Sequence, residues 1–482
     1  MRANNQRILK RAWKAAKNER LLADWLSTGE DLNRELRQQL PVLRTRAREL
    51  EQNSNAARRF LALCETHIVG PQGFGLQVKG TLRNGKPDAK RNRQINDAWW
   101  DWMRPGVGEV TGRLSGPAWQ RLFVRTAARD GEGLMRLHDT APTDENPYGF
   151  AVELLDPSRI PHEYNDTLAT GNVVRLGIEV DRRLRPVAYH LKRDESVVYP
   201  TGQNYERVPA EDIIHFYLAD RPEQLRGVTW MASAMLSMHM LDAYQEAAVT
   251  AARYGAAKMG FFTSPDGSPG AAATDHDGHD FITEVEPGTI ETLPEGYGFV
   301  SHDPAYPHQN YDSFVKAINR DSATGLGVSY HGLTGDLSEA NYGSMRGGAL
   351  EEREGWMTRQ DAIADTVLSR VYRRWLSAAA FHGALGLPIP QDEIVGRFSH
   401  HYWQGRRWPW VDPKKDIETA ILAVKAKLRS PQMVAAELGV DIEDVLDQIA
   451  DFNDMLRAKG LEAEMPNIKG TSKEVSDAIE ED

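Results

Sequence analysis

The feature that most constrains this chain is the run of residues 325–356, which reads GLGVSYHGLTGDLSEANYGSMRGGALEEREGW. Glycines open the run, a polar stretch without a helical period follows, and a charged helix ends it. A compact catalytic core gains little from a flexible polar segment that leads into a long rigid helix. The pattern instead indicates a protein that presents a loop on a stiff helical support.

Length and composition limit the classes of protein to which the chain can belong. At 482 residues the chain exceeds one ordinary domain, which predicts two to four structural units. The apolar fraction of 41% and the charged fraction of 26% are typical of soluble globular proteins. The sequence predicts no membrane span and no secretory signal. The single cysteine, Cys64, lies in an apolar context and is expected to be a small core residue in a reducing cytoplasm.

The formal net charge of −11 is unevenly distributed. The first 60 residues are rich in Arg and Lys, whereas the segment after Val411 is acidic. These clusters are interpreted as solvated helix faces, or as two regions that face different partners. Affinity for duplex DNA comes mostly from neutralised phosphates, so an acidic protein is not a natural tight binder of DNA. An acidic surface would instead keep DNA from adhering.

The first half of the chain predicts helices followed by strands. Residues 4–70 have a helical pattern, in which Pro41 fits a first helical turn and Asn53-Ser54-Asn55 marks a break. The dipeptide Asn84-Gly85 predicts a hairpin-type turn. A helix is expected over residues 117–128, and strands are expected over residues 76–79, 134–138, 151–155, 174–180, 187–192 and 213–217. Together these elements predict an α+β unit that ends near Arg226.

Two long helices dominate the second half. Thr229 is a candidate N-cap for a proline-free helix over residues 230–257, which would be ~42 Å long. This helix is either buried in a core or, because it is rich in alanine, packed against identical helices around a ring. An amphipathic helix over residues 344–377, ~50 Å long, repeats its apolar positions near heptad spacing. Between them the sequence predicts a Gly- and Pro-rich loop, strands over residues 281–286 and 289–293, and a helix over residues 311–325.

Three N-caps predict a small helical region near the C-terminus. Asp412-Pro413 and Ser430-Pro431 each place proline at a first helical position, and Asp441 caps a third helix that ends at Gly460. Residues 466–482 are polar and expected to be disordered.

The sequence was also searched for catalytic chemistry. Residues 80–87, GTLRNGKP, match the spacing of a phosphate loop, but Pro87 stands where a magnesium-binding Ser or Thr is required. The Asn-Gly turn explains this stretch better. Residues 70–75 form a glycine-rich turn after a helix, which is not the setting of a dinucleotide loop.

Metal-capable side chains gather in one loop-like stretch. They are His276, Asp277, His279, Asp280 and, further along, His302. Nothing in that stretch fixes a coordination geometry, so a solvated loop is the favoured interpretation. The HExxH, GxSxG and paired CxxC motifs are not found. The sequence therefore predicts no catalytic residues, no metal site, no cofactor and no enzymatic activity.

Several stretches resemble the portal proteins of lambda-type tailed bacteriophages, in the same order along the chain. Besides residues 325–356, they are RARELEQNSNAARRF, IVGPQGFGLQ, RTAARDGEGLMRL, ELLDPSRIP, IEVDRRLRPVAYHL, DRPEQLRGVTWMASAMLSMHMLDAYQEAAVTAARYGAAKMGFF, EVEPGTIETLPEGYGF and WPWVDPKKDIETA. The resemblance covers the chain from about Arg46 to Gly460. It implies an α+β portal fold with an α/β wing, long stem helices, a small α/β clip, a tunnel loop and a helical crown.

The parts of that fold can be assigned to ranges of this sequence. The assignment is residues 1–225 and 345–411 for the wing, 226–258 and 311–328 for the stem helices, 259–310 for the clip, 329–344 for the tunnel loop, 412–465 for the crown and 466–482 for a flexible tail. The resemblance also implies that the tunnel loop meets DNA. Its side chains would make weak, sequence-independent contacts through Tyr330, His331, Asn341, Tyr342 and Ser344.

The resemblance implies a structural function. Portal proteins form a ring, usually of twelve copies, at one vertex of the capsid, and a separate terminase pumps double-stranded DNA through it. The implied partners are terminase, major capsid and scaffold proteins and head–tail connector proteins, with no membrane. The implied location is the virion, after assembly in the host cytoplasm.

Two other functions remain as alternatives. A DNA-processing enzyme subunit of a phage, such as a nuclease or motor, would need an acidic metal cluster or an intact phosphate loop. An adaptor that binds a membrane or the host surface would need an anchor, which the basic N-terminal helices could supply.

Overall fold

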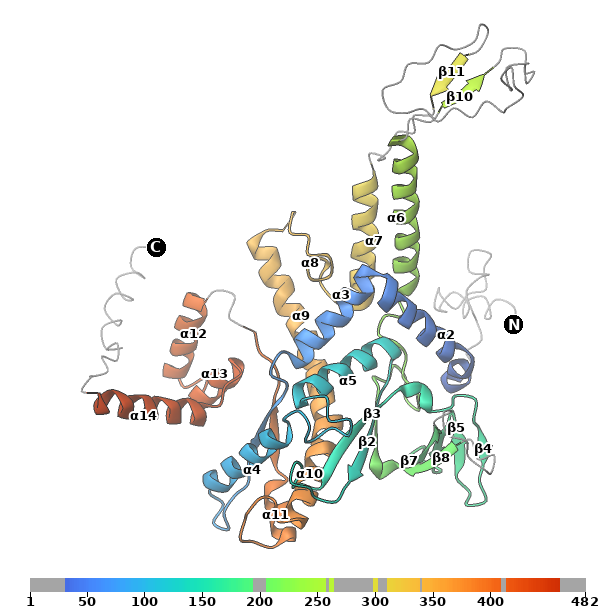
Figure 1. Cartoon of the computed structure of the whole chain (residues 1–482). Coiled ribbons are helices and arrows are strands. Elements are labelled where there is room, and N and C mark those ends of the chain that lie inside the picture. Colours follow the sequence, from blue (N-terminus) through green and yellow to red (C-terminus); the bar gives the residue numbers. More distant parts are fainter. Residues whose placement is uncertain are drawn as a thin grey trace, which may run out of the picture. The chain divides into compact units, whose positions relative to one another are not determined.

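The computed structural model describes residues 31–193, 205–256, 260–263, 298–301, 310–338, 340–408 and 413–459. Within these ranges the chain forms two compact units (Figure 1). The first comprises residues 1–64, 125–134 and 155–352, and the second comprises residues 65–124, 135–154 and 353–482. The strands expected over residues 281–286 and 289–293, the His and Asp cluster and the polar tail lie outside the described residues. The mixture of helices and sheets confirms the predicted α+β class.

The first unit begins with two consecutive helices, α2 (Leu32–Asn53) and α3 (Asn55–Cys64). The side chain of Asp31 caps α2 by accepting a hydrogen bond from the Asn33 amide. Ser54 separates the helices with an extended backbone, so the predicted break is confirmed. Pro41 was predicted to lie in a first helical turn, and this prediction is wrong because Pro41 lies inside α2. The apolar stripe of α2 continues on both sides of Pro41, and its burial sustains the helix there.

A five-stranded antiparallel sheet supplies much of the core of the first unit. Its strand order is β4-β5-β6-β7-β8, with β4 at Asp166–Thr167, β5 at Val173–Arg175, β6 at Ile178–Val180, β7 at Pro186–Lys192 and β8 at Tyr205–Pro209. In the β7–β8 pair, Ala188 lies opposite Pro209 and Lys192 lies opposite Tyr205. A buried apolar cluster includes Ile178, Tyr189 and Val208 from this sheet and Leu134 and Leu225 from outside it.

The single strand predicted over residues 174–180 is wrong, because the chain turns back within it. β5 and β6 pair through Arg175 and Ile178, and Leu176 and Gly177 form the turn with φ of 52° and 81°. A positive φ is costly for leucine, whereas glycine adopts it freely. A Cβ on Gly177 would lie 2.7 Å from the carbonyl oxygen of Pro161, so the position also requires glycine for space.

A three-stranded sheet has the order β3-β2-β9. Its strands are β2 (Gly133–Asp139), β3 (Phe150–Leu155) and β9 (Ile213–Phe216), which confirms three predicted strands. Helix α5 (Gly116–Asp130) precedes β2, as predicted, and the short 3-10 helices η4 (Pro157–Arg159) and η5 (Ala210–Asp212) precede the next strands.

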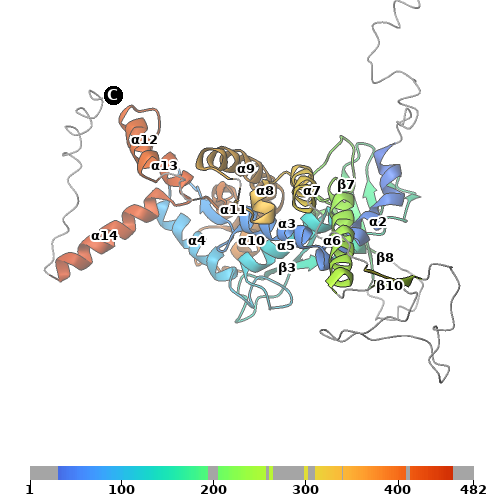
Figure 2. The ribbon, with the colours of Figure 1, turned by 90° about the horizontal axis from the view of Figure 1, so that it is seen from above.

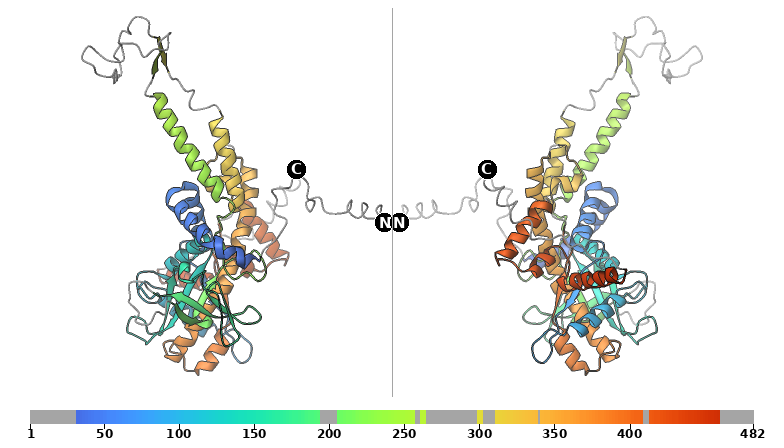
Figure 3. Two further views of the ribbon diagram at one scale, coloured as in Figure 1. Left: turned by 90° about the vertical axis from the view of Figure 1, so that its right-hand side faces the viewer. Right: turned by 90° about the vertical axis from the view of Figure 1, so that its left-hand side faces the viewer.

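Helices α6 (Met235–Ala256) and α7 (Tyr311–Leu326) form an antiparallel pair in the first unit, seen from other directions in Figures 2 and 3. Ser233, just before α6, donates to the carbonyl of Gly325 near the end of α7. Tyr244, further along α6, stacks on Tyr311 at the start of α7 with ring centroids 5.7 Å apart. The start of α6 thus contacts the end of α7, and a later part of α6 contacts the start of α7, so the two helices are antiparallel. Beyond them, β10 (Gly260–Thr263) pairs antiparallel with β11 (Gly298–Ser301).

The predicted start of α6 is wrong by five residues. The Thr229 hydroxyl accepts from the Met231 amide, but the chain then forms turns over residues 230–234 before the helix begins. With 22 residues, α6 is ~33 Å long.

The second unit is held together by aromatic side chains. Trp99 and Trp102 of α4 (Ala89–Trp102) are fully buried with Trp375 of α10 (Ser369–Phe381). Trp99 meets Trp375 edge to face at 5.2 Å between ring centroids, a favoured geometry. Trp403 of β12 (His401–Gln404) completes the group against Trp99. β12 pairs antiparallel with β1 (Gly75–Val78), which joins segments far apart in the sequence.

The predicted long helix over residues 344–377 is observed over a wider range, with a π-helical interruption. α9 (Tyr342–Ile363) passes through the π-helix η6 (Ala364–Leu368) into α10. Two further elements of the second unit are the π-helix η3 (Glu65–Val69) and α11 (Gln391–Phe398). Three C-terminal helices follow: α12 (Pro413–Lys425), α13 (Pro431–Glu437) and α14 (Ile442–Ala458). The Ser430 and Asp441 caps are confirmed.

The stretch that resembles a phosphate loop is a structural turn. Gly85 has φ of 81°, and its amide donates to the carbonyl of Leu82. Gly80 exchanges two hydrogen bonds with the Asn92 side chain, and a Cβ on Gly80 would overlap the Phe398 ring. The predicted Asn-Gly turn is therefore confirmed, and the backbone of Gly80 is already fully engaged.

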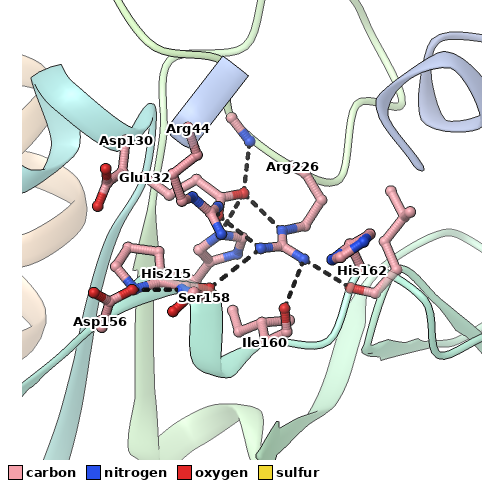
Figure 4. A network of polar contacts seen from close by, with 12 residues as sticks. Arg44, Asp130, Glu132, Asp156, Ser158, Ile160, His162, His215 and Arg226 are labelled. Carbon is pink, nitrogen blue, oxygen red and sulfur yellow. Dashed lines mark hydrogen bonds and ion pairs between the residues drawn. The ribbon is translucent and has the colours of Figure 1, made fainter. Parts of the chain in front are cut away.

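A buried carboxylate organises the first unit (Figure 4). Glu132, at the start of β2, is fully buried and accepts two hydrogen bonds from Arg226, of 2.7 and 2.8 Å. Arg44 of α2 donates to the same carboxylate at 2.9 Å, and the Gly227 amide donates at 2.8 Å. The ring of His215 on β9 lies 3.3 Å from Glu132. One carboxylate thus joins α2, β2, β9 and the chain that leads into α6.

Arg226 also holds the strained turn of the sheet. Its Nη1 atom donates to the carbonyl of Leu176 at 2.9 Å, and it lies 3.4 Å from the carbonyl of Ile160. The planar guanidinium can bind a carboxylate and several carbonyls at once, which an ammonium group cannot do.

A second set of ion pairs lies beside Glu132. Arg48 pairs with both Asp130 and Asp156, and Arg129 pairs with Asp130 and Glu51. Burial raises the pKa of Asp156, but hydrogen bonds from Ser158 and Arg48 outweigh it and lower that pKa to about 2.

The buried groups have shifted pKa values. Burial would raise the pKa of Glu132, but Arg226 and His215 outweigh this and hold it well below the ordinary value. Burial also lowers the pKa of His215, and the attraction of Glu132 only partly opposes that. Glu132 is therefore ionised and His215 neutral in the folded protein near neutral pH.

The first prediction concerns Arg226. Replacing Arg226 with Met leaves Glu132 with a buried charge that has lost its main partner, which is expected to lower the free energy of unfolding by about 3–5 kcal/mol. Lys192→Met is the matched control, since Lys192 forms an exposed pair with Glu163, and it is expected to cost less than about 1 kcal/mol. Urea unfolding followed by circular dichroism measures both. Equal losses in the two variants would contradict the role given to Glu132.

The second prediction concerns pH. Neutral His215 takes up a proton when the protein unfolds below its ordinary pKa of about 6.5, so its contribution is complete above that pH and is lost as pH falls. Glu132, with a lowered pKa, contributes above about pH 4.5 and loses its contribution below that value. Between pH 7 and 5, His215→Asn should therefore flatten the pH dependence of stability by up to about 1.4 kcal/mol per pH unit.

Urea midpoints at pH 5, 6 and 7 test this. His239→Asn, on an exposed position of α6, is the control and should leave the slope unchanged. A His215 variant with the parent slope would show that the pKa of His215 is the same in the folded and unfolded protein, which would contradict this account.

Candidate functional site

The segment predicted to be an irregular polar loop contains a short helix. α8 (Tyr330–Thr334) begins at Ser329, whose hydroxyl accepts from the Gly332 amide, and ends at Gly335 in the left-handed conformation. The expectation of a continuous loop over residues 329–344 is therefore wrong. A Ser N-cap and a Gly C-cap bracket the helix in the sequence and could have predicted it.

Two predicted site residues are brought together by Asp336. The Tyr330 hydroxyl donates to the Asp336 carboxylate at 2.8 Å, and Nδ1 of His331 lies 2.6 Å from the Asp336 backbone carbonyl. The two rings meet edge to face with centroids 5.5 Å apart. Both side chains are half-buried and fold back on their own segment.

Asp336 is the electrostatic centre of the segment. The Ser338 and Tyr330 groups that bond its carboxylate hold its pKa well below the ordinary value. The pKa of Tyr330 is raised, first by burial and then by its bond to Asp336. The carboxylate is therefore ionised near neutral pH, which disfavours close approach of a phosphate to this point.

The helix α8 is anchored to other elements of the first unit. Nε of Arg59 on α3 donates to the carbonyl of Gly332 at 3.0 Å. The Ser329 amide donates to Glu352 of α9 at 3.2 Å. The guanidinium of Arg320, on α7, lies 5.3 Å from the centre of the Tyr330 ring, within reach of a cation–π contact. Leu333 is buried. These contacts anchor the part of the segment that includes α8.

The remaining predicted residues lie at the far end of the segment. Asn341 is exposed and directly precedes α9, whose first residue is Tyr342 and whose third is Ser344. The side chains of Tyr342 and Ser344 lie outside what the structure describes. The structure brings Tyr330 and His331 together, whereas Asn341 lies at the other end of the segment, next to α9. The supports Ser329, Arg59 and Glu352 were missed, because partners so distant in sequence leave no local signal. That these side chains meet DNA stays a prediction.

Within the described ranges no three or more His, Cys, Asp or Glu side chains are arranged to hold a metal ion. No helix in the described part of the chain combines the length and apolar character needed to cross a membrane.

Comparison with known proteins identifies the family. The family model described as "Phage portal protein, lambda family" matches residues 18–360. The chain is 32% identical over 470 residues to "Probable portal protein" of Halomonas phage phiHAP-1, covering 95% of this chain and 89% of that protein. The chain belongs to the lambda family of phage portal proteins. The resemblance seen in the sequence is confirmed, and the function of the chain is that of a phage portal protein.

A more distant relative also matches most of the chain. "Portal protein B" of Escherichia phage lambda is 22% identical over 479 residues, covering 91% of this chain and 88% of that protein. Among solved structures, a chain of "Neck of native GTA particle computed with C12 symmetry" is 13% identical with a TM-score of 0.41, covering 82% of this chain and 93% of that chain. The family is one of structural phage proteins, which supports that interpretation over the DNA-processing enzyme.

The third prediction tests the internal bonds of the segment. Tyr330→Phe removes the hydroxyl that holds Asp336, so amide hydrogen exchange over residues 331–338 should accelerate about fivefold. Tyr311→Phe, on α7, is the matched control and should leave that exchange unchanged. Mass spectrometry of proteolytic fragments measures both variants. An unchanged rate in Tyr330→Phe would mean that the Asp336 contact does not order the segment.

Proposed function

We propose that twelve copies of this chain form a closed ring at one capsid vertex, through which double-stranded DNA enters and leaves the capsid. The observation that carries the proposal is the family match over most of the chain. In the finer assignment, α6 and α7 are the stem, residues 329–344 are the tunnel loop and α12–α14 are the crown. Terminase, capsid and scaffold proteins and head–tail connectors are the proposed partners, and the virion is the proposed location.

The exposed faces of the stem helices support the ring. Leu236 is 69% exposed and Met240 63% exposed on α6, and Val249 and Phe314 are also exposed. Apolar side chains exposed on a helix pair favour burial against another protein surface. In a ring, each copy would cover these side chains on its neighbour through the same head-to-tail contact.

The charge of the chain supports a channel that releases its DNA. Each copy carries a formal −11, so a ring would repel the phosphate backbone over most of its surface. Contact with moving DNA would then fall to a few uncharged groups near residues 335–344. Asn341 is exposed and belongs to this set.

The fourth prediction separates DNA handling from assembly. Replacing Gly335–Ala340 with a Gly-Ser linker of equal length removes Asp336 and Leu337 but keeps the anchors at Ser329 and Gly332. Little apolar surface is lost, so rings should form as in the parent. Packaging or retention of full-length DNA should weaken or fail when this variant replaces the portal protein of the parent phage.

The matched control replaces another exposed six-residue stretch, Thr140–Glu145, with the same linker. It should package DNA like the parent. Nuclease-protected DNA per particle and electron microscopy of purified rings measure the two effects. Loss of rings in the Gly335–Ala340 variant would make the segment an assembly contact, and full packaging by that variant would remove its role in DNA handling.

A further inference from the structure

The three C-terminal helices, labelled α12, α13 and α14 in Figure 1, bury few of their own side chains. Among the described residues of 413–459, only Ala420 and Ala435 are buried. Large apolar side chains lie exposed on or beside all three helices: Ile417, Ile421, Leu422, Leu428, Met433, Leu438, Val440, Leu446, Ile449, Phe452 and Met455. Exposed apolar surface of this extent marks an interaction site.

The exposed positions follow the spacing of interlocking helices. One line, which we term the α12 seam, has steps of four and three residues along α12 and contains Ile417, Ile421 and Val424, and Leu428 lies just beyond the end of the helix. Another, the α14 seam, has steps of three, four, three and four and contains Ile442, Val445, Ile449, Phe452 and Leu456. Such spacing places side chains along one line of a helix, ready to pack between those of a partner helix. Ile421 is 41% exposed and Phe452 55% exposed, whereas Val424, Ile442, Val445 and Leu456 are half-buried. Each seam is therefore only partly covered within the chain.

The two seams carry opposite charge. Residues 413–430 hold five basic side chains, Lys414, Lys415, Lys425, Lys427 and Arg429, against Asp416 and Glu418. α14 holds five acidic side chains, Glu443, Asp444, Asp447, Asp451 and Asp454, against Arg457. A surface around the α12 seam is therefore electrostatically complementary to a surface around the α14 seam, and each repels a copy of itself.

Polar contacts join these helices to the rest of the second unit, including a hydrogen bond of 3.1 Å from the Gln404 side chain to the carbonyl of Ala436. Lys79 lies 3.7 Å from Asp441, and Arg93 lies 2.8 Å from Asp447 in an exposed ion pair. An open cleft of about 830 Å³ lies between β1, α4 and the start of α14. Exposed ion pairs contribute little stability, so these contacts do not replace an apolar core.

We propose that the α12 seam of one copy packs on the α14 seam of the next copy. Each three-helix segment is then completed by its neighbour. Because each copy carries one seam of each charge, the contact can repeat from copy to copy, and it closes into a ring when the rotation between neighbours closes. A reciprocal two-fold dimer would use the same two seams, and the experiment below distinguishes it because it gives covalent dimers and no ladder. The inference rests on the proposed ring and names one of its interfaces. The basic N-terminal segment, residues 1–30, is the competing occupant of the α14 seam, because its charge also complements α14.

Disulfide trapping tests the proposal in the full chain. The only native cysteine, Cys64, is fully buried, so engineered thiols dominate the reaction. A variant with both Ile421→Cys and Phe452→Cys is assembled, oxidised and run on a non-reducing gel. We expect a ladder of covalent multimers, because every copy offers one thiol to each neighbour. Rings mixed from the two single variants should give covalent dimers and nothing larger.

The control pair, Thr419→Cys with Asp451→Cys, lies on the same helices but off the seams. It should give at least about tenfold less multimer, since the thiols are not held close together. Electron microscopy of each sample records whether rings are present. Rings without a ladder, or a disulfide closed within one chain, would overturn this inference and leave the ring intact. The absence of rings in the parent would overturn the proposed function itself.

A further arm addresses the competing occupant. In this case the Phe452→Cys thiol is protected in rings and forms no disulfide with Ile421→Cys. It becomes reactive only when residues 1–30 are deleted. This combination would mean that the N-terminal segment covers the α14 seam. That result would also overturn the contact between copies.

Discussion

The first unit depends on a single buried carboxylate. Glu132 is inaccessible to water, and its negative charge is balanced by Arg226, Arg44 and a backbone amide. Burying this charge therefore costs little folding free energy only while all these groups remain in place. Because those groups come from separate segments of the chain, one interaction fixes how α2, β2 and the approach to α6 are joined. Arg226 extends the constraint to the strained turn at Leu176.

The hydrogen bonds around Glu132 also support the helices that are assigned to the stem. Gly227 follows Arg226 directly, and the chain then enters the turns that precede α6. A Cβ on Gly131 would lie 2.3 Å from the backbone of Val228, so the chain passes too closely there for any larger residue. The antiparallel α6–α7 pair therefore begins from a rigid base, and α8 is anchored to α7 and α3 beside it. A channel that passes DNA needs such support, because a mobile segment can be positioned only by fixed neighbours.

Much of the fold could be predicted from local signals. The Ser430 and Asp441 caps, the Asn84-Gly85 turn and the break at Ser54 each depend on a few neighbouring residues, and the structure confirms them. The failures arose where distant partners decide the outcome. Val174–Val180 looks like one strand because its turn is Leu-Gly, held in place by Arg226 from far along the sequence. The Tyr330–Asp336 contact was missed for a different reason, since its partners are close in the sequence but no pattern indicates which polar groups of a loop bond to each other.

The central claim is that this portal-family chain acts as a closed ring. Electron microscopy of the purified protein, with the number of copies counted in end-on class averages, tests it most directly. The account predicts closed rings of twelve copies with an open central channel. Only monomers or two-fold dimers, across a range of protein and salt concentrations, would contradict it.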